Sequence, residues 1–153
     1  MDYLEIDALI NGIIYSDPAV KQDLGRRFAA HLGLKPGQSG GDGGIDGEGE
    51  VNGQTIYFQS KLYRVPLDAS YAAEFCGNLG IHKADIGIML AGVGYTPGFE
   101  PRLKKYPDIA NNTLKIHLLT LKDIFGKTTT FEEAVVNLPP LRNFSSDSWA
   151  SFR

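Results

Sequence analysis

The Asn52-Gly53 dipeptide places the strongest constraint on how this chain folds. It separates two short strand-like runs, residues 45–51 and 54–61, and Asn-Gly is the dipeptide most typical of a two-residue hairpin turn. Such a turn sets Val51 opposite Gln54 and so determines the pairing along both strands. The sequence therefore predicts an antiparallel hairpin of defined register.

This register is expected to bring three polar side chains to one face of the hairpin. Asp46 is predicted to lie directly opposite Gln59, and Lys61 is predicted to project from the same face as a diagonal neighbour of Asp46. The other face is expected to cover a core with Ile45, Val51, Ile56 and Phe58. An ordinary polar hairpin face is the alternative interpretation.

A carboxylate and an amide oxygen at this spacing are suitable ligands for Mg²⁺, which prefers oxygen donors. Such an ion can bind a phosphate and lower the pKa of a bound water. Lys61 would orient that water, help to deprotonate it, or stabilise charge that develops on the phosphate. The hairpin therefore predicts a site for metal-assisted hydrolysis.

Helical and strand patterns surround the hairpin. Asp17 as cap, Pro18 as first residue and Gly33 just past the end mark one helix. Its apolar stripe is predicted to run through Val20, Leu24, Phe28 and Leu32. Further helices are predicted over residues 3–14, 67–79, 96–106 and 120–126, and further strands over 85–91 and around 114–118. The glycine-rich stretch 34–44 is expected to be an irregular loop.

This order of elements predicts an α/β or α+β fold with a mixed sheet of about four strands flanked by helices. The 153 residues are 42% hydrophobic, which suits a single domain spanning 1–153. No helix is predicted after Gly126, and the chain from about residue 139 is expected to be a loosely packed tail.

Charge and apolar patterning limit the classes of partner. The net charge of −3 weighs against a protein that simply coats nucleic acid, although a metal site needs carboxylates of its own. The apolar runs are too short to cross a bilayer, and the first residues lack the pattern of a signal peptide. The lone Cys76 is expected to be packed in a helix and not reactive. A cytoplasmic protein without a membrane partner is expected.

Two segments together resemble the Mrr-like branch of the restriction endonucleases, within the PD-(D/E)xK nuclease superfamily. They are Gly40-Gly41-Asp42-Gly43-Gly44-Ile45-Asp46 and Phe58-Gln59-Ser60-Lys61. In that branch Q-x-K replaces the usual (D/E)-x-K, and the similarity extends from Asp17 to about Ala91. The resemblance implies a restriction-endonuclease-like core and a DNA endonuclease that uses Mg²⁺, with Mn²⁺ as a substitute.

Matched position by position, the resemblance also implies roles. Asp46 becomes the principal metal ligand, Gln59 the second ligand and Lys61 the catalytic lysine, and the main-chain carbonyl of Ser60 completes the site. The loop residues Asp42, Gly43 and Gly44 are expected to support it, with Asp42 shaping the loop through hydrogen bonds to backbone amides.

The family usually carries an acidic residue, as Phe-Glu, on the helix before the loop, and here the chain departs from the pattern. It has Lys21-Gln22-Asp23 at that place. Asp23 is the candidate auxiliary acid because it is expected to flank the buried stripe, whereas Gln22 is expected to point away from it. A surface aspartate beside Arg26 and Arg27 is the equal alternative.

The candidates for DNA contact are the basic residues Arg26, Arg64, Lys104 and Lys105. Two other functions stay open: a structure-selective nuclease resembling archaeal Holliday-junction resolvases, and a non-catalytic binding module that keeps the fold. Because duplex DNA has two strands, a homodimer is also expected. Its contact area is predicted to come from Phe144, Trp149 and Phe152.

Overall fold

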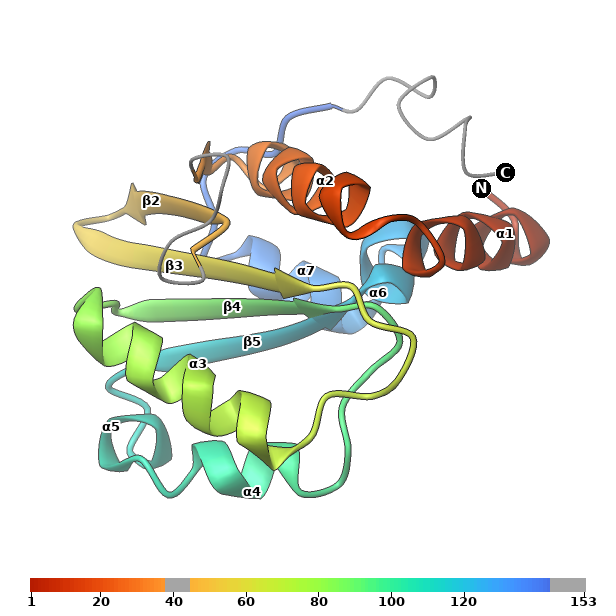
Figure 1. Ribbon diagram of the computed structural model, residues 1–153. Coiled ribbons are helices and arrows are strands. Elements are labelled where there is room, and N and C mark those ends of the chain that lie inside the picture. The colour runs from red at the N-terminus through yellow and green to blue at the C-terminus, as the bar shows by residue number, and fades with distance from the viewer. Residues whose placement is uncertain (38–44, 144–153) are drawn as a thin grey trace.

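A mixed sheet forms the centre of the structure, a computed structural model that describes residues 1–37 and 45–143 (Figure 1). The described strands lie in the order β1 (Lys35–Pro36), β2 (Gly47–Val51), β3 (Gln54–Lys61), β4 (Ile86–Ala91) and β5 (Lys115–Thr120). Strands β1, β2 and β3 pair antiparallel, and β3, β4 and β5 run parallel. The predicted mixed sheet flanked by helices is confirmed. Its fifth strand, which was not predicted, is the two-residue β1.

Helices cover both faces of the sheet. The crossover helices that join β3 to β4 and β4 to β5 lie on one face, and the helices before β1 and after β5 cover the other. One face is covered by α3 (Ala69–Ile81), α4 (Phe99–Leu103) and α5 (Pro107–Ala110) (Figure 1). The other face carries α1 (Tyr3–Ile14), α2 (Pro18–His31), α6 (Leu121–Gly126) and α7 (Thr129–Val135). The result is a layered fold in which β3 and β4 lie between two cores.

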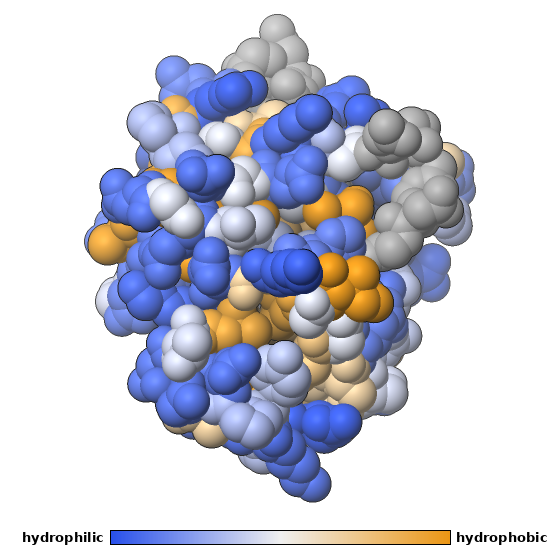
Figure 2. All heavy atoms as spheres, turned by 90° about the vertical axis from the view of Figure 1, so that its left-hand side faces the viewer, coloured by the Kyte–Doolittle hydropathy of each residue, from blue (hydrophilic) through white to orange (hydrophobic). Residues whose placement is uncertain are grey.

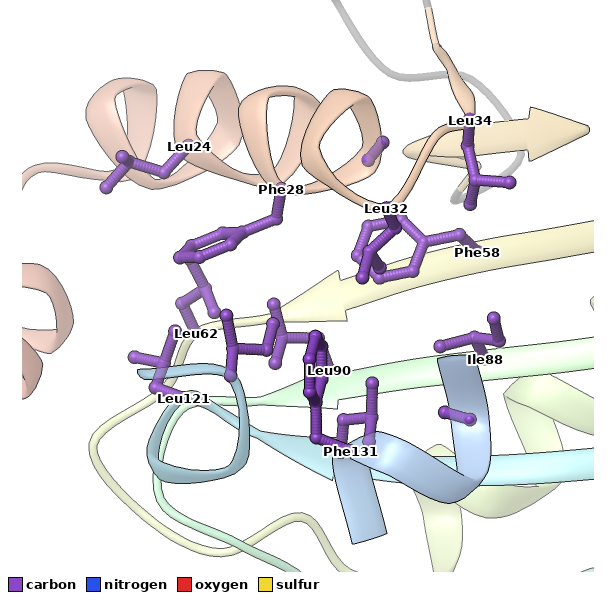
Figure 3. Close-up of a cluster of buried hydrophobic side chains, with 14 of the residues drawn as sticks. Leu24, Phe28, Leu32, Leu34, Phe58, Leu62, Ile88, Leu90, Leu121 and Phe131 are labelled. Carbon is purple, nitrogen blue, oxygen red and sulfur yellow. The ribbon is translucent and has the colours of Figure 1, made fainter. Parts of the chain in front are cut away.

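The core on the α2 side is built from long apolar side chains (Figure 3). Phe28 points from α2 toward Leu62, and Leu32 lies beside Phe58 of β3. Phe28 and Phe58 are both fully buried, and burying one such side chain contributes about 1.5–3 kcal/mol. This core holds α2 against the strand that carries Gln59 and Lys61.

A second core lies on the α3 side of the sheet. It contains Tyr57, Phe75, Met89 and Phe99, so β3 sends alternate side chains into two different cores. Strand β4 is buried at every position, as expected for a central parallel strand covered on both faces.

Several boundaries were predicted correctly, whereas the stripe of α2 was predicted wrongly at its start. Helix α2 follows Asp17, begins at Pro18 and ends before Gly33, whose φ is +81°. Val20, however, is 38% exposed. Residues four apart drift by about 40° per step around a helix, so a stripe of period four leaves the core within a few turns. The buried face instead follows Leu24, Gly25, Phe28 and Ala29.

The chain after Gly126 is more ordered than predicted. Helix α7 begins after Thr128, whose side chain accepts a hydrogen bond from the amide of Phe131, a buried residue. Farther on, the amide of Arg142 donates to the carbonyl of His31 at 2.9 Å, which ties residues 139–143 to the end of α2. Residues 144–153, with the aromatic residues predicted to form a dimer contact, lie outside the described residues.

Figure 2 shows the end of the molecule that carries the β2–β3 turn. There the hydrophobic residues form separate areas that hydrophilic residues border. Within residues 1–37 and 45–143, no helix has the length and apolar character needed to cross a membrane.

Candidate functional site

The hairpin has the predicted register at its turn but changes register at Asp46. Val51 pairs with Gln54, and the pairing continues in step to Gly47 opposite Phe58. The amide of Asp46 then donates to the carbonyl of Phe58 at 2.9 Å. Two consecutive residues thus face one residue of the partner strand, which is a β-bulge. The prediction that Asp46 lies directly opposite Gln59 is therefore wrong.

The bulge changes which side chains share a face. Gly47 faces α2, since a Cβ on it would contact Ala29. Ile45, predicted to join the core beneath Phe58, packs instead against the core that contains Tyr57. A shift of one residue moves side chains to the opposite face of a sheet, so the face assignments beyond Gly47 are reversed.

Asp46 reaches the free edge of β3. Its Oδ2 accepts hydrogen bonds from the amide of Ser60 at 2.6 Å and from Ser60 Oγ at 3.1 Å. The carboxylate therefore takes the place that strand β2 would occupy if it continued. Gly25 permits this arrangement, because a Cβ there would overlap Ser60 Oγ and lie 3.4 Å from Asp46 Oδ1.

The protonation of Asp46 reflects two opposing influences. Burial raises the pKa of its carboxyl group, while the hydrogen bonds from Ser60 and the charge of Lys61 lower that pKa; burial dominates. A carboxylate whose ionised form is destabilised by burial gains from a nearby cation. The electrostatics of the site thus favour binding of positive charge beside Asp46.

Gln59 is buried beside two side chains of the α3 layer. It is 1% exposed, with its Oε1 3.4 Å from the Tyr57 hydroxyl and its Nε2 3.4 Å from Glu74 Oε1. Both distances are long for hydrogen bonds, so the amide oxygen is held weakly. Burial is the main cause that raises the pKa of the Tyr57 hydroxyl, which stays a neutral donor.

Lys61 is positioned by an ion pair and by aromatic rings. Its Nζ lies 3.3 Å from Glu74 Oε1 and 5.6 Å from the centre of the Tyr71 ring. Glu74 of α3 therefore contacts both Gln59 and Lys61, a role that the sequence did not reveal. Its only sequence signal was its place on the helix that flanks the sheet.

A cleft of about 320 Å³ joins these groups. Asp46, Gln59, Ser60 and Lys61 all line it, as do Pro18, Lys21 and Gln22 of α2. The predicted catalytic and ligand residues of the hairpin thus lie together, although the bulge and not a directly opposed pair brings Asp46 to the site.

Asp23, the candidate auxiliary acid, does not line this cleft. Its carboxylate is half exposed and lies 3.0 Å from Arg27 Nε and 3.9 Å from Arg26 Nη1. Gln22 lines the cleft instead. Pro18, Lys21 and Gln22 are spaced i, i+3 and i+4 and so share one face of α2, whereas Asp23 points about 100° beyond Gln22 and away from that face. The surface interpretation of Asp23 agrees with this geometry.

The residues proposed for DNA contact are scattered over the fold. Arg26 donates from Nε to the carbonyl of Gly37 at 2.7 Å, and Arg64 packs over the Tyr15 ring. Lys104 pairs with Glu100 and lines a different cleft, and Lys105 follows it just beyond α4. The expected supporting residues Asp42, Gly43 and Gly44 lie outside the described residues.

The donor set at the cleft fits a hard divalent cation such as Mg²⁺. Asp46 Oδ1 receives no hydrogen bond from the described residues, and Gln59 offers a weakly held amide oxygen. The carbonyl of Ser60 points to the same edge as its amide, since both groups of a strand residue face one neighbour. Consistently, the next carbonyl, that of Lys61, points to the other side and accepts from Gly92 at 3.1 Å.

Three or more His, Cys, Asp or Glu side chains do not cluster around any common point in the described parts of the chain. The oxygen donors at the cleft differ from such a cluster, because they are one carboxylate, one side-chain amide and one backbone carbonyl. In comparisons with known proteins, the chain matches no protein-family model and no curated protein.

Proposed function

We propose that this chain is a Mg²⁺-dependent DNA endonuclease of the PD-(D/E)xK type, with a role in DNA restriction or repair. The observation that carries the proposal is the cleft in which Asp46, Gln59, Ser60 and Lys61 meet. Their order along the chain is that of the Mrr-like motif, and their oxygen donors suit Mg²⁺ or Mn²⁺. The cytoplasm is the proposed location.

Asp46, Gln59 and the carbonyl of Ser60 would hold the cation. When bound, it would polarise the scissile phosphate and lower the pKa of an attacking water. Ser60 fixes the rotamer of Asp46 through two hydrogen bonds to Oδ2, so Oδ1, which accepts no hydrogen bond from the described residues, has a defined direction. That arrangement pre-organises the ligand set before the cation arrives.

Lys61 would place its ammonium group beside the phosphate. The ion pair with Glu74 and the nearby Tyr71 ring restrict the rotamers of Lys61. The ammonium group can orient the attacking water or offset charge that develops on the phosphate oxygens. Glu74 would act as a positioning residue through Lys61.

The test is cleavage of supercoiled, linear, methylated and branched DNA with Mg²⁺ and with EDTA. Asp46→Asn keeps an acceptor for Ser60 but removes the charge, and Lys61→Met keeps the aliphatic stem. Loss of one transition-state interaction of this type lowers rates by about 10²–10³-fold. Both variants should therefore lose nearly all cleavage.

Two matched variants control for indirect effects. Asp85→Asn alters a carboxylate that also accepts from a β3 amide, that of Thr55 at 2.8 Å. Lys122→Met alters a lysine that lies 5.4 Å from the ring of Tyr3. Both should cut like the parent chain. Full cleavage by the Asp46 or Lys61 variant, with folding verified by circular dichroism, would refute the assignment.

Preference for four-way junctions over duplexes in the same panel would favour the structure-selective nuclease. Binding of Mn²⁺ without cleavage of any substrate would favour a non-catalytic module. A homodimer on duplex DNA belongs to the same proposal, and light scattering of the Asp46→Asn variant with a short duplex tests it. A 1:1 complex with nicks as sole product would argue for a nickase.

A further inference from the structure

Two cations, Lys21 and Arg64, lie at the cleft or close to it. Lys21 of α2 lines the cleft, and Arg64 directly follows Tyr63, which also lines it. Lys61 differs, because Glu74 lies 3.3 Å from it. In the described chain, neither Lys21 nor Arg64 lies within ion-pair distance of a carboxylate. Among the described residues, the two cations thus have no ion-pair partner, and the carboxylate that lines the same cleft is that of Asp46.

An aromatic ring holds Arg64 in place. Its guanidinium carbon lies 4.4 Å from the centre of the Tyr15 ring, a distance typical of a cation–π contact. Tyr15 is the C-cap that follows α1, and Pro18, three residues later, lines the cleft. The turn between α1 and α2 therefore holds the guanidinium next to the exit of β3. A guanidinium fixed in this way presents its donors in a planar fork that matches phosphate oxygens.

The two cations also act on each other. Burial is the first cause that lowers the pKa of Lys21, and the charge of Arg64 lowers it further. The chain as a whole carries a net charge of −3, so an excess of cations does not explain the pair. Like charges kept together in this way are stabilised when an anion lies between them.

We propose that Lys21 and Arg64 form a phosphate subsite that binds the DNA backbone at a phosphodiester adjacent to the one cleaved at Asp46. This inference rests on the proposed nuclease function for the identity of its ligand. The subsite reads no base, because it offers only charge and donors to phosphate oxygens. It would set the position of the strand relative to the metal ligands.

The salt dependence of DNA binding tests the subsite without any need for catalysis. A fluorescent duplex is titrated with the Asp46→Asn variant in EDTA, alone and combined with Lys21→Gln, Arg64→Gln or both. Each lost phosphate contact should reduce the slope of log K against log salt by about 0.9. Between about 50 and 200 mM salt, this slope change alters the affinity ratio of variant to parent about 3.5-fold per contact.

Lys122→Gln is the matched control, because Lys122, like Arg64, lies over a tyrosine ring at one end of α1. It should leave the slope unchanged, and Arg64→Lys should restore most of the slope by returning the charge. Unchanged slopes in both glutamine variants would overturn the subsite. An equal loss in Lys122→Gln would also overturn it, since the effect would then be general charge.

A competing arm uses inorganic phosphate as the probe. Free phosphate could raise the melting temperature of the parent but not of the Lys21→Gln/Arg64→Gln double variant, while the salt slope of DNA binding is the same for both. That result would show a site for free phosphate and refute the DNA backbone as its ligand. The two proposals also fail separately. Reduced slopes with no Mg²⁺-dependent cleavage would retain the subsite and reject the nuclease, whereas cleavage with unchanged slopes would do the reverse.

Discussion

Gly25→Ala tests the close approach of α2 to the edge of β3 where Ser60 contacts Asp46. A Cβ at this position would overlap Ser60 Oγ, while its next neighbour, Asp46 Oδ1, lies at an ordinary contact distance of 3.4 Å. The backbone of α2 need not move if the hydroxyl rotates away. That rotation breaks the hydrogen bond from Ser60 Oγ to Asp46, which measures 3.1 Å.

Two opposing free energies decide the outcome. Replacing glycine by alanine inside a helix stabilises it by about 0.8–1.0 kcal/mol. Loss of a hydrogen bond to a charged group costs about 1.5–3 kcal/mol. Gly25→Ala should therefore lower the free energy of unfolding by about 0.5–2 kcal/mol, or the melting temperature by a few degrees.

In a Ser60→Ala background, Gly25→Ala should raise the free energy of unfolding instead of lowering it. There the hydroxyl is already absent, and the Cβ introduced by Gly25→Ala would contact only Asp46 at an ordinary distance. Gly25→Ala should then stabilise the protein by about 1 kcal/mol. Urea unfolding of the four proteins in EDTA measures the coupling, which is expected to be about 1.5–3 kcal/mol.

Gly77→Ala supplies the matched control, because Gly77 lies inside α3 and a Cβ there would meet nothing within 4 Å. It should stabilise the protein by about 1 kcal/mol in either background. If Gly25→Ala stabilised the parent as much as Gly77→Ala does, the contact between α2 and Ser60 would be refuted.

Three further predictions follow from the site and the core. Because burial raises the pKa of Asp46, the protonated carboxyl stabilises the fold below the unfolded value of about 4, and this contribution is lost as pH rises through the folded pKa. Asp46→Asn should therefore gain stability relative to the parent from about pH 3 to 7 in EDTA; a falling difference in urea unfolding would contradict this. Gln59→Glu should bury a carboxylate 3.4 Å from Glu74 and destabilise the metal-free protein by about 1–3 kcal/mol. Mn²⁺ should then raise the melting temperature of this variant more than that of the parent. An equal rise in both proteins would count against Gln59 as a ligand. Phe28→Ala should cost about 3–5 kcal/mol, because the ring is fully buried, and a loss below about 1 kcal/mol by urea unfolding would be inconsistent with the packing.

Local signals predicted much of the framework. The Asn52-Gly53 turn, the end of α2 at Gly33 and the cap of α6 at Thr120 are all present in the structure. Each depends on a few consecutive residues whose backbone preference or side-chain hydrogen bonds act over short range. The predicted strands and helices occur in the expected order for the same reason, whereas β1, α5 and α7 were not predicted.

The geometry around Asp46 could not be predicted in this way. The hairpin rule continues the register past Gly47, whereas the chain forms a bulge there. The bulge brings the Asp46 carboxylate to Ser60, and at the same place Ala29 of α2 lies against Gly47. A turn rule contains no information about a helix that packs from elsewhere in the chain.

By itself, the sequence determined the hairpin, the residue types at the site and the class of cation that they suit, because these follow from local spacing and donor chemistry. Only the tertiary structure decided that Gln22 and not Asp23 lines the cleft, and that Glu74 contacts Lys61. Those choices depend on the rotation of α2 and the placement of α3 against β3. Packing of the two cores sets both, and a rotation of one residue, about 100° on a helix, is enough to exchange one side chain for its neighbour.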